Sequence, residues 1–235
     1  MKADFHSHIL PCFDDGVINT AQTAKYIALL KKNGITHIYS TSHYIPHREP
    51  VDDFICRRKE AYAKLVSELE SDGKSIPEIR LGAEVHMEKG ISQNDKLPLL
   101  CIEGTNVILL ELPYREYEPW MLEEIYNIVF KFKIHPLIAH LNRYFSIYND
   151  SQLSQILSVK NAVYQFNLEA FESRSSSRRI IRLISGGLPA VFGTDYHGDM
   201  DELGDFFINF ERRTKKKDIA DMTESTEQKV LEGML

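Results

Sequence analysis

Histidine and carboxylate side chains follow short apolar segments at intervals along the whole sequence. The first pair is His6-Ser7-His8, in which two imidazoles occupy alternate positions of an extended segment and point to the same side. The last group is Asp195-Tyr196-His197, and the residues in comparable positions between these groups are His43, Glu84, Glu111 and His140. Imidazole combined with carboxylate, without thiolate, is the ligand chemistry of zinc, manganese and iron sites. The pattern therefore indicates a metal site assembled from distant parts of the chain.

Two of the carboxylates lie in apolar surroundings. Glu111 is embedded in the sequence VILLELP, and Glu84 directly follows Leu81-Gly82-Ala83. Burying a carboxylate is costly unless it is paired with a cation or bound to a metal ion. A single histidine at the end of a strand can equally be a hydrogen-bonded structural residue. The two carboxylates favour the metal site.

Four other histidines do not share this position. His37 and His135 fall at the beginnings of predicted strands, on the opposite face, and we expect them to be structural. His47 and His86 fall in predicted loops, where a solvated or substrate-facing role is open.

The three cysteines exclude one kind of phosphatase chemistry. A cysteine-based phosphatase needs an arginine six residues after its nucleophile, so that a loop of amides can hold the phosphate. Cys12, Cys56 and Cys101 are followed at that distance by Ile18, Tyr62 and Val107. They also form no zinc spacing and no disulfide framework, which fits a reducing cytoplasm.

Short apolar segments alternate with longer segments of helical period, as in a parallel sheet with helical crossovers. The predicted strands are Ala3–Phe5, Ile35–Thr41, Ile79–Ala83, Val107–Leu112, Pro136–Ala139, Ala162–Phe166 and Ala190–Gly193. The predicted helices are Thr20–Asn33, Val51–Asp72, Pro119–Phe132, Ser151–Val159, Ser177–Ser185 and Met200–Arg212. Six of the seven strands deliver His, Asp or Glu at the carboxyl edge, where ligands collect in such folds. Periodicity alone leaves an open sheet and a closed barrel as alternatives.

Length and composition indicate one globular domain over residues 1–235. The formal net charge of −6 gives no affinity for nucleic acid backbones. No apolar run is long enough to span a membrane, and the first residues, MKADFHSH, are not a signal peptide. The polar tail Lys215–Leu235 becomes amphipathic around Val230, and we expect a terminal helix that packs on the outside.

The motifs together resemble those of a known superfamily. They are HSHILPCFDDG at 6–16, the strand-end His43, GAEV around Glu84, LLELP around Glu111, HLNRY at 140–144 and GTDYH at 193–197. In this order they resemble the PHP (polymerase and histidinol phosphatase) superfamily, and within it the bacterial manganese-dependent tyrosine phosphatases of capsule and exopolysaccharide loci (CpsB/CapC-like). The resemblance extends to about Phe206. It implies an α/β fold, a distorted (β/α)7 TIM-like barrel, with a trinuclear metal site.

The resemblance also implies the ligands, which are three divalent ions, manganese before iron or zinc. One ion would be held by His6, His8, Glu84 and Asp195; a second by Glu84, Glu111 and His140; a third by Asp15, His43 and His197. Asp14 is the alternative to Asp15, which is preferred for its offset from His6. Arg143 matches the arginine that holds the substrate phosphate, although a surface arginine paired with a carboxylate would look the same in sequence.

Three departures from the family pattern stand out. Cys12 occupies a position where many members have glycine, and Ser42 a position where many have proline. The stretch GDMDELGDF after the Asp195-Tyr196-His197 motif lacks a second family arginine. Either Arg48 or His47 completes the phosphate pocket in its place, or the preferred substrate differs from that of the family.

The residues predict a metal-dependent phosphomonoester hydrolase, and the resemblance implies that it acts on phosphotyrosine. A metal-bound hydroxide would attack phosphorus in line, Arg143 would hold the phosphate oxygens, and Asp15 or His197 would help to protonate the leaving oxygen. The expected partner is a phosphotyrosine-bearing protein, with the tail of a bacterial tyrosine kinase as one possibility. The alternatives are a small-molecule phosphatase of the histidinol phosphate type and a non-catalytic PHP binding module.

Overall fold

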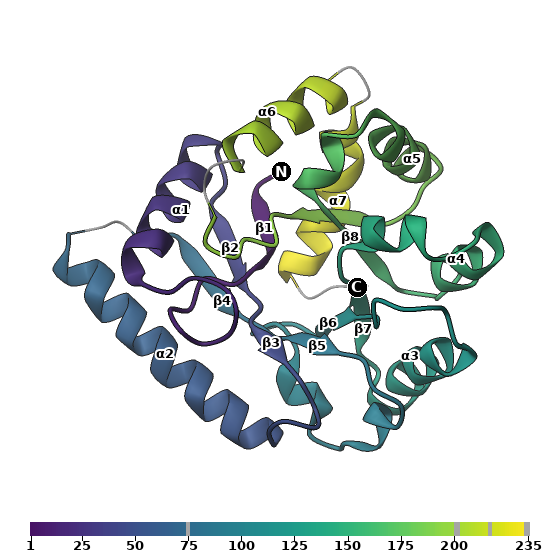
Figure 1. Ribbon diagram of the computed structural model, residues 1–235, viewed down its shortest axis with the longest axis horizontal. Coiled ribbons are helices and arrows are strands. Elements are labelled where there is room, and N and C mark those ends of the chain that lie inside the picture. Colours follow the sequence, from purple (N-terminus) through teal and green to yellow (C-terminus); the bar gives the residue numbers. More distant parts are fainter. Residues whose placement is uncertain (74–75, 200–202, 216–217, 233–235) are drawn as a thin grey trace.

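The computed structural model describes residues 1–73, 76–199, 203–215 and 218–232, in which helices surround a ring of parallel strands (Figure 1). The strands are β1 (Ala3–Ser7), β2 (His37–Ser40), β3 (His43–Tyr44), β4 (Glu78–Leu81), β5 (Glu84–His86), β6 (Val107–Glu111), β7 (His135–Ile138), β8 (Val163–Asn167) and β9 (Ala190–Gly193). They form two sheets, β1-β2-β4 and β3-β5-β6-β7-β8-β9, with every pairing parallel.

Two of the predicted strands are each followed, after a break, by a second segment. The predicted strand at 35–41 corresponds to β2, and the predicted strand at 79–83 corresponds to β4. Each is continued beyond its predicted end by a further segment, β3 or β5, so seven predicted strands appear as nine segments. At the breaks the ladder shifts, because the amide of Glu84 donates to the carbonyls of both Thr41 and Ser42. His43 and Glu84 therefore begin second segments, side by side in register, where the sequence predicted that they would end strands.

A polar seam closes the ring between β1 and β9. The backbone there is joined by an isolated bridge between Ser7 and Tyr196. The buried carboxylate of Asp4 spans the seam: it accepts from the amides of His6 (3.1 Å) and Thr194 (2.9 Å), and from the hydroxyls of Thr194 (2.7 Å) and Tyr26. The alternative that periodicity left open is thereby resolved, because the strands form a closed barrel.

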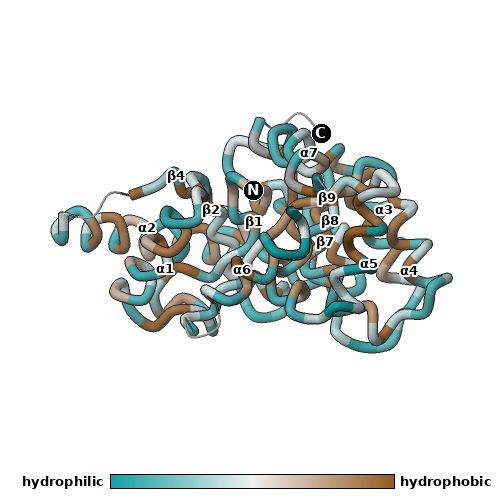
Figure 2. The backbone as a smooth tube through the Cα atoms, turned by 90° about the horizontal axis from the view of Figure 1, so that it is seen from above, coloured by the Kyte–Doolittle hydropathy of each residue, from teal (hydrophilic) through white to brown (hydrophobic). Residues whose placement is uncertain are grey.

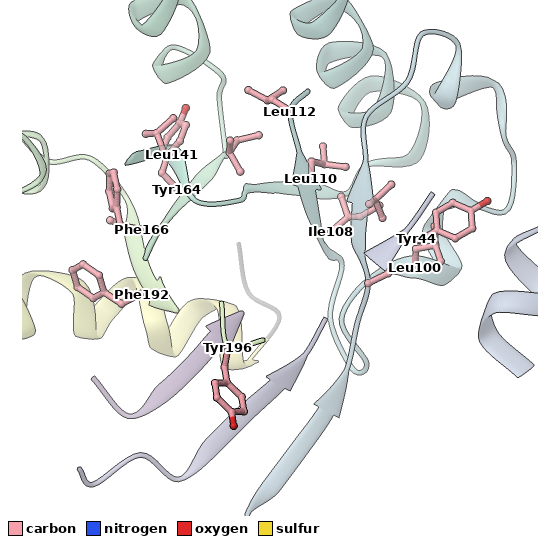
Figure 3. Close-up of a cluster of buried hydrophobic side chains, with 14 of the residues drawn as sticks. Tyr44, Leu100, Ile108, Leu110, Leu112, Leu141, Tyr164, Phe166, Phe192 and Tyr196 are labelled. Carbon is pink, nitrogen blue, oxygen red and sulfur yellow. The ribbon is translucent and has the colours of Figure 1, made fainter. Parts of the chain in front are cut away.

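The strands pack on two different apolar clusters. Val107 and Leu109 of β6 belong to a cluster inside the barrel, together with residues such as Phe5, Leu137 and Val163. Ile108 and Leu110, at the alternate positions, belong to the larger cluster between strands and helices, shown in Figure 3. This strand is buried on both faces, as expected in a parallel sheet, so its sequence is continuously apolar.

The helices lie close to the predicted positions: α1 (Thr20–Lys32), α2 (Val51–Ser71), α3 (Pro119–Phe132), α4 (Asp150–Leu157), α5 (Arg174–Ser185), α6 (Leu203–Thr214) and α7 (Ile219–Glu232). Short 3-10 turns cover Ile91–Gln93, Leu97–Leu100, Leu141–Ser146 and Leu168–Phe171. α5 begins three residues before the predicted start, because Ser173 caps it by accepting from the amide of Ser176. Residues 200–202 of the predicted sixth helix lie outside the described residues. None of the described helices has the length and apolarity needed to cross a membrane.

The terminal helix α7 does not simply pack on the outside, as the sequence predicted. It lies across one end of the set of strands (Figures 1 and 2). Val230 is fully buried in the cluster inside the barrel, and the carboxylate of Glu227 accepts from the backbone nitrogen of Lys2 at 2.9 Å. α7 therefore closes the amino-terminal mouth of the barrel.

Candidate metal centre

Four buried side chains converge at the carboxyl edge of the strands. His6 belongs to β1 and His8 directly follows it, Glu84 begins β5, and Asp195 comes from the residues after β9. Each offers a ligand atom, and these atoms all lie within 4.8 Å of one another. The Nε2 atom of His6 lies 3.1 Å from Glu84 Oε2 and 3.3 Å from Asp195 Oδ1. The structure thus brings together the four residues predicted to hold the first metal ion.

The contacts within this cluster fit a shared cation. Nε2 of His6 lies 3.1 Å from Nε2 of His8, and two imidazole lone pairs at that distance repel each other unless a cation or a proton lies between them. Glu84 Oε2 is buried and makes no hydrogen bond with the described residues, although His43 Nδ1, His6 Nε2 and His8 Nε2 lie within 3.3 Å. A buried carboxylate oxygen without a hydrogen bond is costly, and a metal ion would satisfy it.

A second group shares Glu84. Its Oε1 lies 2.8 Å from Nε2 of His140, which also lies 3.6 Å from Glu111 Oε1. His43 can join Glu84 and Glu111 in this group as a further ligand. The other oxygen of Glu111 contacts Nδ1 of His86 at 3.0 Å, and His86 belongs to β5 and not to the loop that the sequence predicted.

The third predicted group lies at the exposed side of the site. His43 Nε2 and His197 Nε2 lie 3.4 Å and 3.5 Å from Asp15 Oδ1, and His8 completes a candidate set of four. Asp15 is 70% exposed, whereas the neighbouring Asp14 is turned inward. Asp14 accepts from Nδ1 of His8 and from the amide of His43, both at 2.9 Å. This geometry favours Asp15 as a ligand and gives Asp14 the task of orienting His8.

The charges of the site balance one another. Burial alone would raise the pKa of Glu111, but hydrogen bonds from His140 and His86 lower it to about 2. Burial alone would lower the pKa of His140, but hydrogen bonds to Glu111 and Glu84 raise it to about 9. The pKa of Asp195 is likewise held well below its ordinary value beside His6 and His8, against the effect of burial. Without metal ions, a proton on His140 therefore supplies part of the positive charge that Glu84 and Glu111 require.

Two of the converging residues have strained backbones. His140 has φ of 29° and Asp195 has φ of 54°, both in a region that residues other than glycine rarely occupy. Such strain persists where the surrounding structure enforces it, and it concentrates at functional sites.

Arg143 lies beside the site in the turn after β7. Its Nη2 donates to Asp195 Oδ2 at 2.5 Å, and its side chain is 37% exposed. The structure thus places it at the predicted edge and also in an ion pair with a candidate ligand. Arg48 lines a cleft of about 410 Å³, and Asp15, His43 and Glu111 line the same cleft. His37 and His135 lie outside the site, in contact with Glu78 and with the carbonyl of Asn161.

Sequence reasoning missed two buried amides of β8, the strand without a predicted ligand. Gln165 contacts both His6 and the backbone of His140, and Asn167 donates to Asp195. A signal was present in the sequence, because Val163, Gln165 and Asn167 alternate along one face of an otherwise apolar strand. Buried amides in such a strand need partners, and here the partners are the candidate ligands.

Comparison with known proteins agrees with this arrangement. A family model described as "Capsular polysaccharide synthesis, CpsB/CapC" matches residues 2–229. The tyrosine-protein phosphatase YwqE of Bacillus subtilis (strain 168) is 27% identical over 202 residues, which cover 83% of this chain and 76% of that protein.

The fold matches a chain from the crystal structures of YwqE from Bacillus subtilis and CpsB from Streptococcus pneumoniae, which are described as unique metal-dependent tyrosine phosphatases. The TM-score is 0.80 at 20% identity, over 99% of this chain and 94% of that chain. This match confirms the predicted fold.

Proposed function

Because the chain belongs to the CpsB/CapC family of capsular polysaccharide synthesis, we propose that it is a metal-dependent protein-tyrosine phosphatase. The observation that carries this proposal is the position of Glu84 Oε2, which is buried among three imidazole nitrogens and makes no hydrogen bond within the described part of the chain. The relatives reported above, which are tyrosine phosphatases by name, supply the reaction class.

The proposed ligands follow the three groups of the site. His6, His8, Glu84 and Asp195 would hold one divalent ion, Glu84, Glu111 and His140 a second, and Asp15, His43 and His197 a third. Manganese is the ion we expect, with iron or zinc as the alternatives that this ligand set also suits. Bound in this way, the ions would neutralise phosphate oxygens and lower the pKa of water toward about 7.

Arg143 is proposed to hold the phosphate. Among the described residues, only Nη2 of its guanidinium is at hydrogen-bonding distance from a carboxylate, since the Nε contact with Glu169 is 3.8 Å long. A guanidinium has five N–H donors, so donors remain for a phosphate at this edge. The ion pair with Asp195 would keep the guanidinium in place before the substrate arrives.

Asp15 and His197 are proposed to handle the proton of the leaving group. They are the most exposed of the proposed metal ligands, with side-chain exposures of 70% and 32%, and we expect each to be within reach of an incoming substrate. A phenolate leaves more readily than an alkoxide, so this step contributes less for phosphotyrosine than for an alkyl phosphate.

The openness of this side also supports the substrate class. A ligand as exposed as Asp15 suits a tyrosine presented on a protein tail better than a metabolite that must be enclosed. The tail of a bacterial tyrosine kinase is the first substrate we would test. The three cysteines are unpaired, which supports the cytoplasm as the place of action.

The test is a pair of assays on the purified protein. Metal removal with a chelator should abolish hydrolysis of a phosphotyrosine peptide, and manganese should restore it. His140→Ala should lose both metal and activity, whereas His135→Ala, a histidine outside the site, should keep both. Full activity of the metal-free protein would refute the metal-dependent mechanism. A preference for histidinol phosphate over the peptide would refute the substrate class.

A further inference from the structure

The amides of Gln165 and Asn167 form a continuous chain of hydrogen bonds beneath the site. Both side chains are fully buried. Oε1 of Gln165 lies 2.5 Å from the backbone nitrogen of His140 and 3.1 Å from Nδ1 of His6. Nε2 of Gln165 donates to Oδ1 of Asn167 at 2.8 Å, and Nδ2 of Asn167 donates to Oδ2 of Asp195 at 3.0 Å. The chain thus links residues that follow or belong to three other strands.

The direction of this chain is fixed by one backbone group. The N–H of His140 can only donate, so the atom of Gln165 that faces it must be the carbonyl oxygen. The same oxygen faces Nδ1 of His6, and since it can only accept, Nδ1 must carry a proton. The lone pair of a neutral His6 is then on Nε2, the atom that faces Glu84 and Asp195.

The far end of the chain acts on a carboxylate. With Nε2 of Gln165 occupied by Asn167, the NH2 group of Asn167 faces Asp195 Oδ2 and leaves Oδ1 directed at His6 and His8. In a further hydrogen bond, the backbone N–H of Asn167 donates to Oδ1 of Asn142 at 2.9 Å. This bond holds the end of β8 against the turn that carries Arg143.

We propose that Gln165 and Asn167 are positioning residues that fix the metal-binding tautomer of His6 and the orientation of Asp195. The strand that contributes no ligand thereby prepares ligands from β1 and from the segment after β9. Partners of this kind, which hold the second nitrogen of a ligand histidine, typically raise metal affinity about 10- to 100-fold. The inference rests on the metal site of the proposed function but not on the reaction catalysed there.

The first experiment uses the unaltered protein. In protein labelled with 15N-histidine and loaded with diamagnetic zinc, the His6 ring should show a proton on Nδ1 and zinc on Nε2. The resonance is assigned from its loss in His6→Gln. A proton on Nε2 of His6 would overturn the proposal without reference to any Gln165 variant.

The second experiment measures manganese affinity by calorimetry on chelator-treated protein. Gln165→Leu removes both the acceptor that faces His6 and His140 and the donor that faces Asn167. It should weaken manganese binding at the affected site at least tenfold. Gln165→Glu keeps an acceptor for His6 and His140, so it should recover part of the lost affinity. Val163→Ala is the matched control, since Val163 lies two residues earlier on the same face of β8 and takes no part in the chain.

The outcomes separate this inference from the proposed function. Folded Gln165→Leu that binds manganese like the parent, or that loses no more affinity than Val163→Ala, would overturn it. Gln165→Glu with no recovery would also count against it. Suppose that the parent binds manganese and, when loaded with zinc, carries a proton on Nδ1 of His6, but hydrolyses no phosphotyrosine peptide. Then the proposed function fails and the positioning role stands.

Discussion

The inside of the barrel has two ends that are built from opposite kinds of side chain. At the carboxyl ends of the strands it is filled by imidazoles and carboxylates such as His6 and Glu84. At the amino ends it is filled by apolar residues such as Phe5 and Leu109, and Val230 of α7 closes it. On β8 the change from one to the other takes two residues, from Val163 to Gln165. The comparison teaches that one end stabilises the fold and the other is stable only when its charges are compensated.

The largest effect is expected from removing the carboxylate of Glu84, which two of the candidate ligand groups share. Glu84→Gln keeps the size of the side chain but removes the charge that faces four histidines. We expect loss of metal and a fall in kcat/KM on the order of 10³-fold or more, because metal-ion catalysis supplies several kcal/mol. Metal analysis and a phosphatase assay check this. Glu78→Gln, on the surface at the start of β4, is the control and should change neither. A Glu84→Gln protein with full metal content would show that the polar end does not depend on this carboxylate to hold its metal ions.

The second test asks whether Arg143, at the same end, binds the substrate without being needed for metal binding. Arg143→Ala should lower kcat/KM, with a loss of transition-state stabilisation of about 2–4 kcal/mol, because the phosphate loses its bidentate donor. Arg143→Lys should recover only part of this, since an ammonium cannot make two parallel hydrogen bonds. Metal content should stay at the parent level. Arg179→Ala, which disrupts a surface pair with Asp150, is the control. An unfolded Arg143→Ala would reduce Arg143 to a structural ion pair.

The third test addresses the apolar end. Val230→Ala removes two methyl groups from a fully buried position and should lower the free energy of unfolding by about 2 kcal/mol. The value of kcat/KM should not change, because α7 lies at the mouth opposite to the candidate ligands. Denaturant melts and the phosphatase assay measure the two quantities, and Met222→Ala, at an exposed position of α7, is the control. A loss of activity without a loss of stability would show that the two ends are not separate.

The smallest effect is expected at Cys12, near the polar end. Its φ is 54°, which a side chain disfavours by roughly 1–2 kcal/mol and glycine tolerates. Cys12→Gly should therefore melt at the same temperature or a few degrees higher, and Cys12→Ser should retain most activity, because no cysteine is the nucleophile. Thermal melts and kcat/KM check both variants. Inactivation of a folded Cys12→Ser would implicate the thiol in the chemistry.

The alternation of strands and helices, and the residues that converge at the carboxyl edge, could be predicted from the sequence, because apolar segments ended by histidine or carboxylate are local patterns. Periodicity did not predict the closed barrel, which only the resemblance to the PHP superfamily implied. The breaks at Thr41-Ser42 and Gly82-Ala83 were not predictable in this way, since they arise from hydrogen bonds between neighbouring strands. The same limit applied to α7: its amphipathic pattern predicted a packed helix, but only the three-dimensional arrangement of the termini places Val230 inside the barrel. The choice between Asp14 and Asp15 likewise depended on which side chain turns inward.

The seam between β1 and β9 has a consequence for the time at which this protein can acquire metal during its synthesis. Asp4 and Thr194 are 190 residues apart in the chain. At roughly 5–20 residues per second, a ribosome needs about 10–40 s to add the second partner after the first. Throughout that interval His6 and His8 exist without Asp195 and His197. Metal loading of the full site is therefore delayed until the segment through His197 has been translated, and chains terminated before that segment lack the finished site.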